Sequence, residues 1–482
     1  MRNHMLAAIT VLLFASPSLA QRFQLVETRV PIRLTAQEPR IVAVADLNGD
    51  GRDDLLVSVP KEVNAEAGER FEKTPLYEYA SVSNGRFRRA PLVRGTVRAR
   101  TPVVAVDDFN GDGRDDLAVF DAGVYVTSIS LGYGNPPQLF LSQPRGGHVR
   151  SHALAHAVRR QHRRNPPYTL SGPADLHIKT TSTGDIDNDG DVDLWIESTG
   201  GANVTSHFMV NQGDGTFEIE RARAPAELLH NPEPEYWRHQ GNDLVDLDND
   251  GDLDLVLGQM RDTDPTHVSQ FSIVLLNDGT GYYRSRIELP HPRFARAFTH
   301  VPGLTHFDVN DDGLEDLLLL HQRNDEVDLQ GWLDWTGRYI QVLVNRGDLS
   351  FADETRTRIG NQGYSRPQRY PDGSMLYGEA LPVLHDINRD GCPELVMTNQ
   401  TAPITRRTPV AYRNNGRGQF RRMSPETFLA PPHDWGHSLM PADVNGDGLV
   451  DLVYPAFDFD TGEMALVTLL NRTRPRPIRC SG

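Results

Sequence analysis

The chain alternates short polar segments with short apolar ones, and one such alternation recurs seven times. Each copy begins with an acidic segment of nine residues, such as DLNGDGRDD from Asp46, and continues with an apolar run that starts with leucine. Runs such as LLVSV after Asp54 and LVLGQ after Asp254 have the length and composition of β-strands. Recurrence at intervals of 57 to 78 residues is typical of a repeat protein.

A second phrase follows most acidic segments and indicates a hairpin. It reads NQGDGTF from Asn211, NDGTGYY from Asn277, NRGDLSF from Asn345, NNGRGQF from Asn414 and a shorter NGRF from Asn84. An apolar run precedes each glycine-rich turn and an aromatic residue follows it, as in a β-hairpin. Each copy therefore predicts strand A, an acidic loop, strands B and C, a glycine turn and strand D. Seven such copies predict an all-β fold, a seven-bladed β-propeller with four-stranded antiparallel blades.

The two ends of the chain predict how the ring closes. The seventh copy reaches LVTLLNRT, around Asn471, and stops before a fourth strand. The segment QRFQLVETRV near the N-terminus has the pattern of that missing strand. We expect the N-terminal strand, within about residues 22–30 and formed by Phe23 to Val30, to take the outer place of the last blade and remove its open edge.

The acidic loops carry the ligands that calcium prefers. Oxygen-bearing side chains stand at places one, three, five and nine, and the sixth place is always glycine, which permits a sharp turn. Calcium takes six to eight oxygen ligands, and the variable seventh place would supply only its backbone carbonyl. We therefore expect up to seven structural Ca²⁺ ions. The predicted ligands are Asp46, Asn48, Asp50, Arg52 and Asp54; Asp108, Asn110, Asp112, Arg114 and Asp116; Asp185, Asp187, Asp189, Asp191 and Asp193; Asp246, Asp248, Asp250, Asp252 and Asp254; Asp308, Asn310, Asp312, Leu314 and Asp316; Asp386, Asn388, Asp390, Cys392 and Glu394; Asp443, Asn445, Asp447, Leu449 and Asp451.

The competing interpretation is an acidic, solvated turn, since Asn, Asp and Gly also favour turns. Seven copies with the same alternation favour the metal. The loops match the first nine places of an EF-hand, but no helix follows and the glutamate at the twelfth place is missing. The ion would therefore lie between two strands.

These loops and their register resemble the FG-GAP/VCBS repeat family, the calcium-loop propellers related to the integrin α head. The match covers nearly all of the chain after residue 20. The resemblance implies that the loop aspartates and asparagines bind calcium, directly so for six loops. The sixth departs, with Glu394 in place of aspartate and Cys392 at the carbonyl place, so we expect it to be the weakest site.

Charge and the N-terminus limit the partners and the location. The formal net charge is -16, and close to half of the 65 acidic residues lie in the loops, which argues against a nucleic-acid partner. Clustered carboxylates repel one another, so bound cations should stabilise the fold. Residues 1–20 have the form of a cleaved signal peptide, which predicts a secreted, periplasmic or cell-surface propeller over residues 21–482. The alternative is a membrane anchor, but the apolar run from Met5 to Ala15 is too short for a span.

Loop placement predicts which face binds a ligand. The acidic loops and glycine turns should share one face, and the insertions 142–178, 218–241, 321–337 and 352–380 should lie on the opposite one. Aromatic and basic residues gather in these connections, namely Trp237, Trp332, Trp335, Trp435, Tyr168, Tyr236, Tyr364, Tyr370, Tyr377, Arg159, Arg160, Arg163, Arg164, Arg366 and Arg369. Such side chains suit a carbohydrate, an anionic polymer or a protein ligand. The alternative is that the aromatic residues only pack the insertions together.

Two functions remain open on the sequence. The first is a calcium-stabilised recognition or adhesion module with a carbohydrate or protein ligand. The second is a carbohydrate-active enzyme, similar to polysaccharide lyases that use calcium-loop propellers, with its active site on the face opposite the loops. The chain lacks G-x-S-x-G, H-E-x-x-H, P-loop and C-x-x-C motifs, so we assign no catalytic residues. Catalytic residues scattered among blades would leave no motif.

Weaker signals give four smaller expectations. His152 and His156 have the spacing of two zinc ligands on a helix, but no acidic partner is near. The RGD tripeptide at 346–348 occupies a glycine turn and is expected to be structural. Asn203, Asn399 and Asn471 begin glycosylation sequons. Cys392 and Cys480 are the only cysteines, and one bridge between them is compatible with export.

Overall fold

A computed structural model describes most of the chain. It covers residues 23–30, 39–59, 76–94, 97, 99, 101–122, 124–126, 131–133, 136–164, 178–198, 206–225, 239–259, 271–292, 298–327, 333–360, 383–397, 410–423, 434–435, 439–458 and 461–473.

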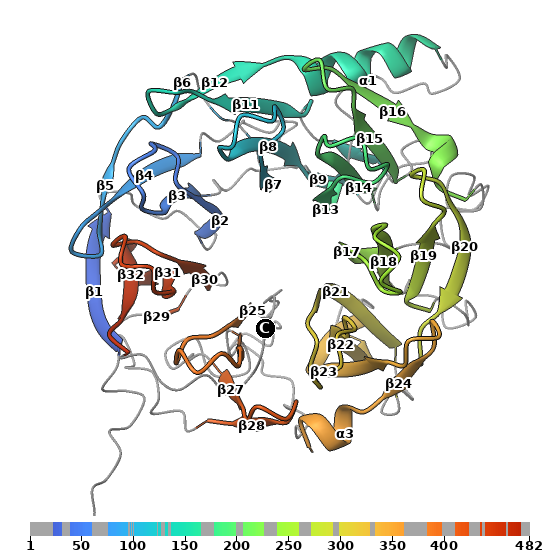
Figure 1. Ribbon diagram of the computed structural model, residues 1–482. Helices are drawn as coiled ribbons and strands as arrows, with labels where there is room; N and C mark the ends of the chain where they lie inside the picture. The colour runs from blue at the N-terminus through green and yellow to red at the C-terminus, as the bar shows by residue number, and fades with distance from the viewer. Residues whose placement is uncertain are drawn as a thin grey trace, which may run out of the picture.

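Seven antiparallel sheets stand around a common centre and form a closed ring (Figure 1). The seven-bladed propeller predicted from the repeats is confirmed. The first three blades contain β2 (Arg40–Ala45), β3 (Asp54–Ser58), β4 (Tyr77–Val82) and β5 (Arg86–Arg89); β7 (Pro102–Asp107), β8 (Asp116–Asp121), β11 (Gln138–Ser142) and β12 (His148–Ser151), with β6 (Val93–Arg94) parallel to β12; and β13 (Ile178–Gly184), β14 (Asp193–Ser198), β15 (His207–Asn211) and β16 (Phe217–Glu220).

The other four blades follow the same order from the centre outward. They contain β17 (His239–Val245), β18 (Asp254–Gln259), β19 (Ile273–Asn277) and β20 (Tyr283–Glu288); β21 (Phe298–His306), β22 (Leu317–Val327), β23 (Leu333–Asn345) and β24 (Phe351–Asp353); β25 (Val383–His385), β26 (Glu394–Met397), β27 (Val410–Asn414) and β28 (Phe420–Arg422); and β30 (Met440–Ala442), β31 (Asp451–Asp458), β32 (Glu463–Asn471) and β1 (Phe23–Val30), with β29 (Asp434–Trp435) also paired to β31. A small hairpin of β9 (Val124–Val126) and β10 (Leu131–Tyr133) leaves the second blade.

Each second strand is apolar because both of its faces are covered by a neighbouring blade. In β3, Leu55 and Val57 pack into the core shared with the last blade, whereas Leu56 packs into the core shared with the second. Successive side chains of a strand point to opposite faces, so a strand buried on both sides needs a continuous apolar run. In β3, β8 and β18, the buried stretch begins with the last aspartate of the acidic loop, and the leucine follows it directly.

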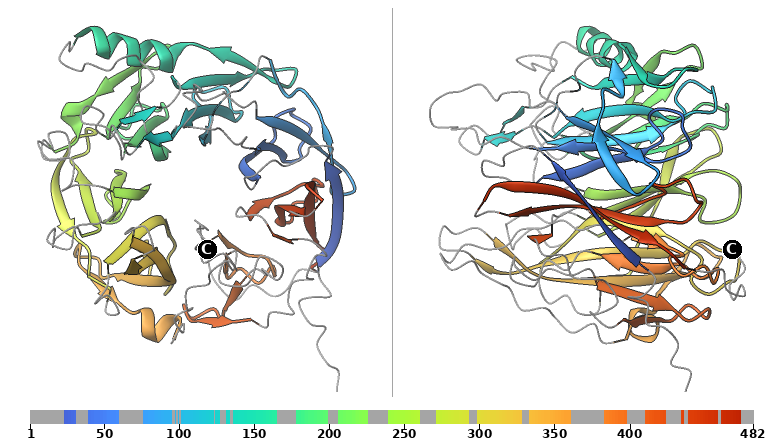
Figure 2. Two further views of the ribbon diagram at one scale, coloured as in Figure 1. Left: turned by 180° about the vertical axis from the view of Figure 1, so that it is seen from behind. Right: turned by 90° about the vertical axis from the view of Figure 1, so that its left-hand side faces the viewer.

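The ring closes through β1, the outermost strand of the seventh blade. β1 pairs with β32 without interruption, from Phe23 opposite Asn471 to Val30 opposite Met464. This is the place that the sequence predicts for the N-terminal strand. The Thr468 hydroxyl also donates a hydrogen bond of 2.9 Å to the Gly85 carbonyl of the first blade. The two chain ends therefore hold the last blade and bind it to the first (Figure 2).

The region 142–178 corrects one prediction. Its residues 143–147 form the C–D turn of the second blade, and the Gly147 amide donates to the Leu47 carbonyl in the first acidic loop. After β12 comes the helix α1 (Ala153–Arg164), which the sequence expected on the face opposite the loops. Instead α1 lies on the outer rim, where Leu154 and Val158 pack into the core between the second and third blades (Figure 1).

The short helices are peripheral. A 3-10 turn, η3 (Arg221–Arg223), follows β16, and α3 (Thr355–Arg358) follows β24. The described part of the chain contains no helix with the length and apolar character needed to cross a membrane.

Candidate metal centres in the blade loops

The first aspartate of each loop closes the loop on itself. In the first loop, Asp46 accepts hydrogen bonds from the backbone amides of Gly49, Asp50 and Gly51, at 2.8, 3.0 and 2.8 Å. The bond from the sixth-place glycine recurs in the other six loops, at 2.6 to 3.0 Å. The first-place carboxylate therefore sets the loop shape before any ion is considered.

The sixth-place glycine is required by backbone conformation. Its φ angle is positive in all seven loops, from +73° at Gly448 to +93° at Gly190 and Gly251. A Cβ added at Gly51 or Gly190 would meet no atom within 4 Å, so space is not the constraint. A residue with a Cβ would be strained at this φ, which explains why all seven copies keep glycine.

The ninth-place carboxylate braces the loop against the hairpin of its own blade. Asp193 accepts the backbone amides of Asn211 and Ile186, at 2.7 and 3.2 Å. Asp316 accepts the corresponding amides of Asn345 and Val309, at 2.7 and 2.9 Å. These bonds place the A–B loop and the C–D turn at the same end of a blade, as predicted.

Burial raises the pKa of these ninth-place carboxyls. The pKa reaches about 7 for the groups in the third, fourth, fifth and seventh loops and about 6 in the first two, although the backbone hydrogen bonds oppose the shift. A nearby divalent cation would favour the ionised form instead, so ion binding should strengthen as the pH rises toward 7.

In the third, fourth, fifth and seventh blades, an asparagine before the glycine turn joins the blade to the previous one, a function that the sequence did not indicate. Asn277 Nδ2 donates to the carbonyl of Ile186 in the third loop at 2.8 Å, and to that of Leu253 in its own loop at 3.2 Å. The corresponding side chains Asn211, Asn345 and Asn471 repeat both bonds. In the first blade the residue bonded to the ninth-place carboxylate is Ser81, so the NGRF phrase three residues later is not its equivalent.

Carboxylate oxygens converge most closely in the third and fourth loops. One oxygen each of Asp185, Asp187 and Asp193 lie within 4.8 Å of one another, and Asp246, Asp248 and Asp250 form a second such group. Buried oxygens of Asp187, Asp246 and Asp248 find no hydrogen-bond partner among the described residues. Buried acceptors without donors are costly unless a cation satisfies them, so these oxygens fit a calcium ion.

Arginines contact the predicted ligands in several loops. Arg114 donates to Asp112 of its own loop at 2.5 Å, and Arg52 pairs with Asp50 in the same way. Arg223, from η3, bridges Asp187 at 2.8 Å and the Thr280 carbonyl of the next blade at 3.2 Å. A guanidinium beside a ligand carboxylate offsets part of its charge and should lower the affinity of that loop for a cation.

The seventh-place residue of the sixth loop is covalently tied. Cys392 is fully buried and disulfide-bonded. The only other cysteine of the sequence, Cys480, lies outside the described residues.

The residues predicted for the opposite face are only partly described. Trp335 and Trp435 lie in β23 and β29, and Arg163 and Arg164 end α1. Arg160 donates to the Phe217 carbonyl at 2.5 Å and fastens α1 to β16, whereas Arg159 is exposed. The remaining candidates lie outside the described residues: Trp237, Trp332, Tyr168, Tyr236, Tyr364, Tyr370, Tyr377, Arg366 and Arg369.

Three weaker signals have structural explanations. In the RGD turn, Asp348 accepts bonds from the Ser350 amide and hydroxyl, which close the turn. His152, directly before α1, and His156, on α1, are exposed, and their rings stack with centroids 5.9 Å apart. Neither belongs to a group of described residues whose ligand atoms converge as for a metal ion. The side chain of Asn471 is fully buried in the blade contact described above, which shields it from glycosylation in the folded protein. The sequons at Asn203 and Asn399 lie outside the described residues.

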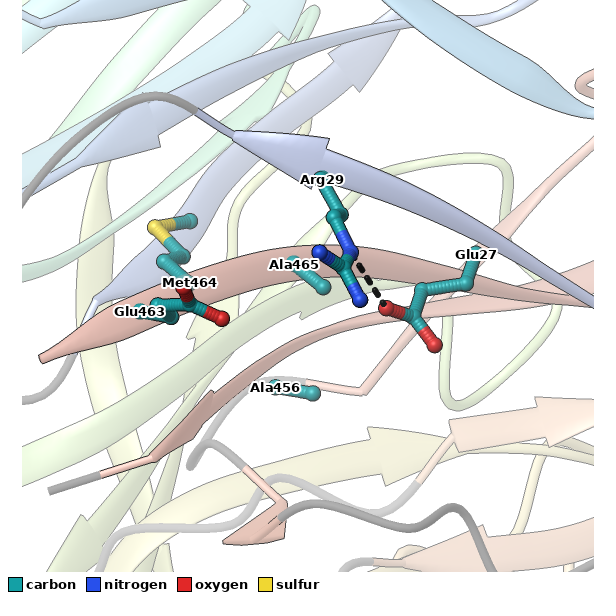
Figure 3. A pocket seen from close by; sticks show the side chains of 6 residues that line it. All are labelled: Glu27, Arg29, Ala456, Glu463, Met464 and Ala465. Carbon is teal, nitrogen blue, oxygen red and sulfur yellow. Dashed lines mark ion pairs between the residues drawn. The ribbon is translucent and has the colours of Figure 1, made fainter. Parts of the chain in front are cut away.

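A small depression lies on the rim of the seventh blade, where β1, β31 and β32 meet (Figure 3). Its lining includes Arg29 and Glu27, whose charged groups approach to 4.0 Å. The space has room for about one water molecule, which is too small for a carbohydrate or peptide ligand.

The recurring loops are matched by two family models. An FG-GAP-like repeat model matches residues 185–257 and 386–454, and an FG-GAP repeat model matches residues 39–69. The chain is thus a seven-bladed β-propeller that contains FG-GAP and FG-GAP-like repeats, and the resemblance drawn from the loops is confirmed. No curated protein matches the chain significantly.

The solved structures to which the chain is similar are distant from it in sequence. A lectin from Agrocybe aegerita that recognises non-reducing terminal N-acetylglucosamine is 14% identical, with 82% of each chain covered and a TM-score of 0.46. The exotype rhamnogalacturonan lyase YesX is 13% identical over 95% of this chain and 77% of its own, with a TM-score of 0.44. The rhamnogalacturonan lyase YesW is 14% identical over 94% and 76%, with a TM-score of 0.45.

Proposed function

We propose that the protein is an exported, calcium-binding β-propeller that acts as a recognition or adhesion module for a carbohydrate or protein ligand. Calcium would be structural and would occupy the A–B loops. The ligand would bind the face opposite these loops. Residues 1–20 would serve as the signal peptide.

The convergent carboxylates of the third and fourth loops carry the calcium part of this proposal. Three negative oxygens within 4.8 Å of one another repel unless a cation lies between them. One buried oxygen in each of Asp187, Asp246 and Asp248 has no hydrogen-bond partner among the described residues. Hard oxygen donors in a loop with a glycine turn are the set that Ca²⁺ prefers. Seven loops built around the same first-place bond extend the proposal to every blade.

The B–C connections on the face opposite the acidic loops support the proposal that this face binds a ligand. The B–C connections leave the ring away from the acidic loops, and β22 and β23 extend there as strands of 11 and 13 residues. The β9–β10 hairpin leaves on the same side (Figure 2). Rigid hairpins on a closed ring can present a binding surface without moving the metal loops.

Thermal unfolding tests the calcium part. With calcium at about 100 times its dissociation constant, each occupied site should stabilise the fold by about 2.7 kcal/mol. We expect EDTA to lower the melting temperature by several degrees, and we expect D246N/D248N to lose part of the calcium effect. The control is S285A, at an exposed position of β20, whose melting temperatures in calcium and in EDTA should match those of the wild type. Identical melting in calcium and EDTA would refute the calcium assignment.

A ligand screen tests the recognition part. Glycan and polysaccharide arrays, with calcium present, should show binding without any new unsaturated or reducing ends. Turnover would establish the enzymatic alternative in place of the module. Absence of any glycan binding would leave a protein ligand as the remaining form of the proposal, to be tested by pull-down against surface proteins.

A further inference from the structure

The sixth loop differs from the others in how its ninth-place carboxyl is used. In the other loops aspartate stands at this place, and amide donors reach both oxygens of residues such as Asp193 and Asp316. In the sixth loop the longer Glu394 accepts one bond at Oε1, from Asn388 Nδ2. The other oxygens of this pair, Glu394 Oε2 and Asn388 Oδ1, are buried and have no hydrogen-bond partner among the described residues.

The sixth loop is also the one whose ligands are enclosed. Asn388 and Asp390 are each 1% exposed, and Glu394 is completely buried. At the fifth place of the other six loops the aspartate is exposed to solvent. A chelator or a water molecule can reach those loops directly, whereas the sixth loop must first open.

The net charge of this enclosed loop matches one divalent cation. Asp386, Asp390 and Glu394 supply three carboxylates, and Arg413 contacts Asp390 at 3.2 Å and supplies one positive charge. With all three carboxylates ionised, the set carries a charge of about -2, which a divalent ion would neutralise. The two buried acceptor oxygens without a partner, Glu394 Oε2 and Asn388 Oδ1, would gain a ligand bond from such an ion.

We propose that the sixth loop is a closed calcium site that exchanges its ion more slowly than the other six and keeps it when they are emptied. This inference rests on the proposed calcium-binding function. It reverses the expectation from Glu394 and Cys392 in the sequence that the sixth loop is the weakest calcium site. The disulfide at buried Cys392 fixes the seventh place, so the loop cannot open as freely as its counterparts.

Native mass spectrometry of the calcium-loaded full chain, recorded before and after prolonged dialysis against EDTA without reductant, tests the proposal. The wild type should carry several ions before dialysis and one ion afterwards. The variant E394Q should lose that last ion. The matched control D316N, which makes the same change from carboxylate to amide at the ninth place of the exposed fifth loop, should still retain one ion.

A second variant separates a local effect from misfolding. E394D restores the residue of the other six loops, and it should keep the wild-type circular dichroism spectrum while releasing its ion together with the others. Loss of every ion from the wild type at one rate would overturn the inference, as would retention of one ion by a folded E394Q or E394D. If the loaded wild type carries no ion at all, the proposed function itself fails.

Discussion

Asn345 shows how one side chain can hold three parts of a propeller. Its Nδ2 donates to the Leu247 carbonyl of the previous blade at 2.6 Å and to the Glu315 carbonyl of its own loop at 3.3 Å. Its Oδ1 accepts the Gly347 amide of its own turn at 3.0 Å. All three contacts are lost together if the amide is removed.

We therefore expect N345A to destabilise the protein by about 1–3 kcal/mol, because buried carbonyl groups lose their donor. Urea unfolding would measure this change. The control N84A removes an exposed asparagine whose side chain accepts the Arg86 amide at 3.2 Å. It should lower the free energy of unfolding by only a few tenths of the loss expected for N345A. Equal effects of the two substitutions would contradict the role given to Asn345.

Glu197 is a buried carboxyl outside the metal loops. The Ser206 hydroxyl and the Trp195 indole N–H donate to its two oxygens at 2.8 and 3.0 Å. Burial raises its pKa from 4.5 to about 8, although these hydrogen bonds oppose the shift. Since the unfolded chain releases this proton near pH 4.5 and the folded chain keeps it until about pH 8, stability falls as the pH rises between these values.

E197Q should abolish this decline, because the amide does not titrate. In saturating calcium, the free energy of unfolding of the variant relative to wild type should become more favourable by about 1 kcal/mol or more between pH 5 and pH 8, since each pKa unit corresponds to about 1.4 kcal/mol. Denaturant titrations at several pH values would show it. Parallel pH profiles of variant and wild type would rule out this pKa shift.

At the scale of elements, neighbouring metal loops contact each other directly. Asn188 Nδ2 in the third loop donates to Asp252 Oδ1 in the fourth at 2.6 Å, and Asn249 Nδ2 in the fourth donates to the Gly313 carbonyl in the fifth at 2.9 Å. Both asparagines hold the fourth place, with φ near +58°. Ordering one loop should therefore favour the order of the next.

Replacing Asn188 with glycine should weaken this coupling. Glycine stands at the same place in the first, second and seventh loops and tolerates the positive φ, so the loop itself should persist. We expect N188G to lower the Hill slope of terbium binding, measured by luminescence. The matched control is R389G, since Arg389 has φ +59° at the same place and forms no hydrogen bond or ion pair with another loop among the described residues. A Hill slope that N188G leaves unchanged would argue against coupled loops.

The elements were predictable where their signal is local and repeated. The period, the glycine at the sixth place and the leucine after each loop define the blades, because these requirements act within a few residues. The bond between Asn345 and Leu247 joins residues 98 positions apart, and only the folded ring brings them together. The turn at 143–147 lacks the asparagine of its counterparts, so the sequence did not mark it as a C–D turn. The apolar residues of α1 do not indicate which side of the ring the helix packs against.

At the scale of the molecule, the ring depends on a strand contributed by the other end of the chain. β1 pairs with β32 from Met464 to Asn471, and Val26 and Val30 belong to the core between the last and first blades. Without β1, the edge of β32 and this core would face solvent.

Deleting residues 21–30 should therefore abolish the cooperative melting of the wild type and promote aggregation. A synthetic peptide of residues 21–32 should restore the melting transition by pairing with β32. A control peptide carrying Val26→Asp should not, because it would place a charge in the shared core. A truncated chain that melts like the intact protein would show that closure by β1 is dispensable.

The most direct test of the account is anomalous diffraction from crystals grown with abundant calcium. We predict a peak inside each blade loop, surrounded by the first, third and fifth side chains, and strongest in the third, fourth and sixth loops. Loops without peaks, in crystals whose blades still form the closed ring, would contradict the claim that divalent ions hold these turns.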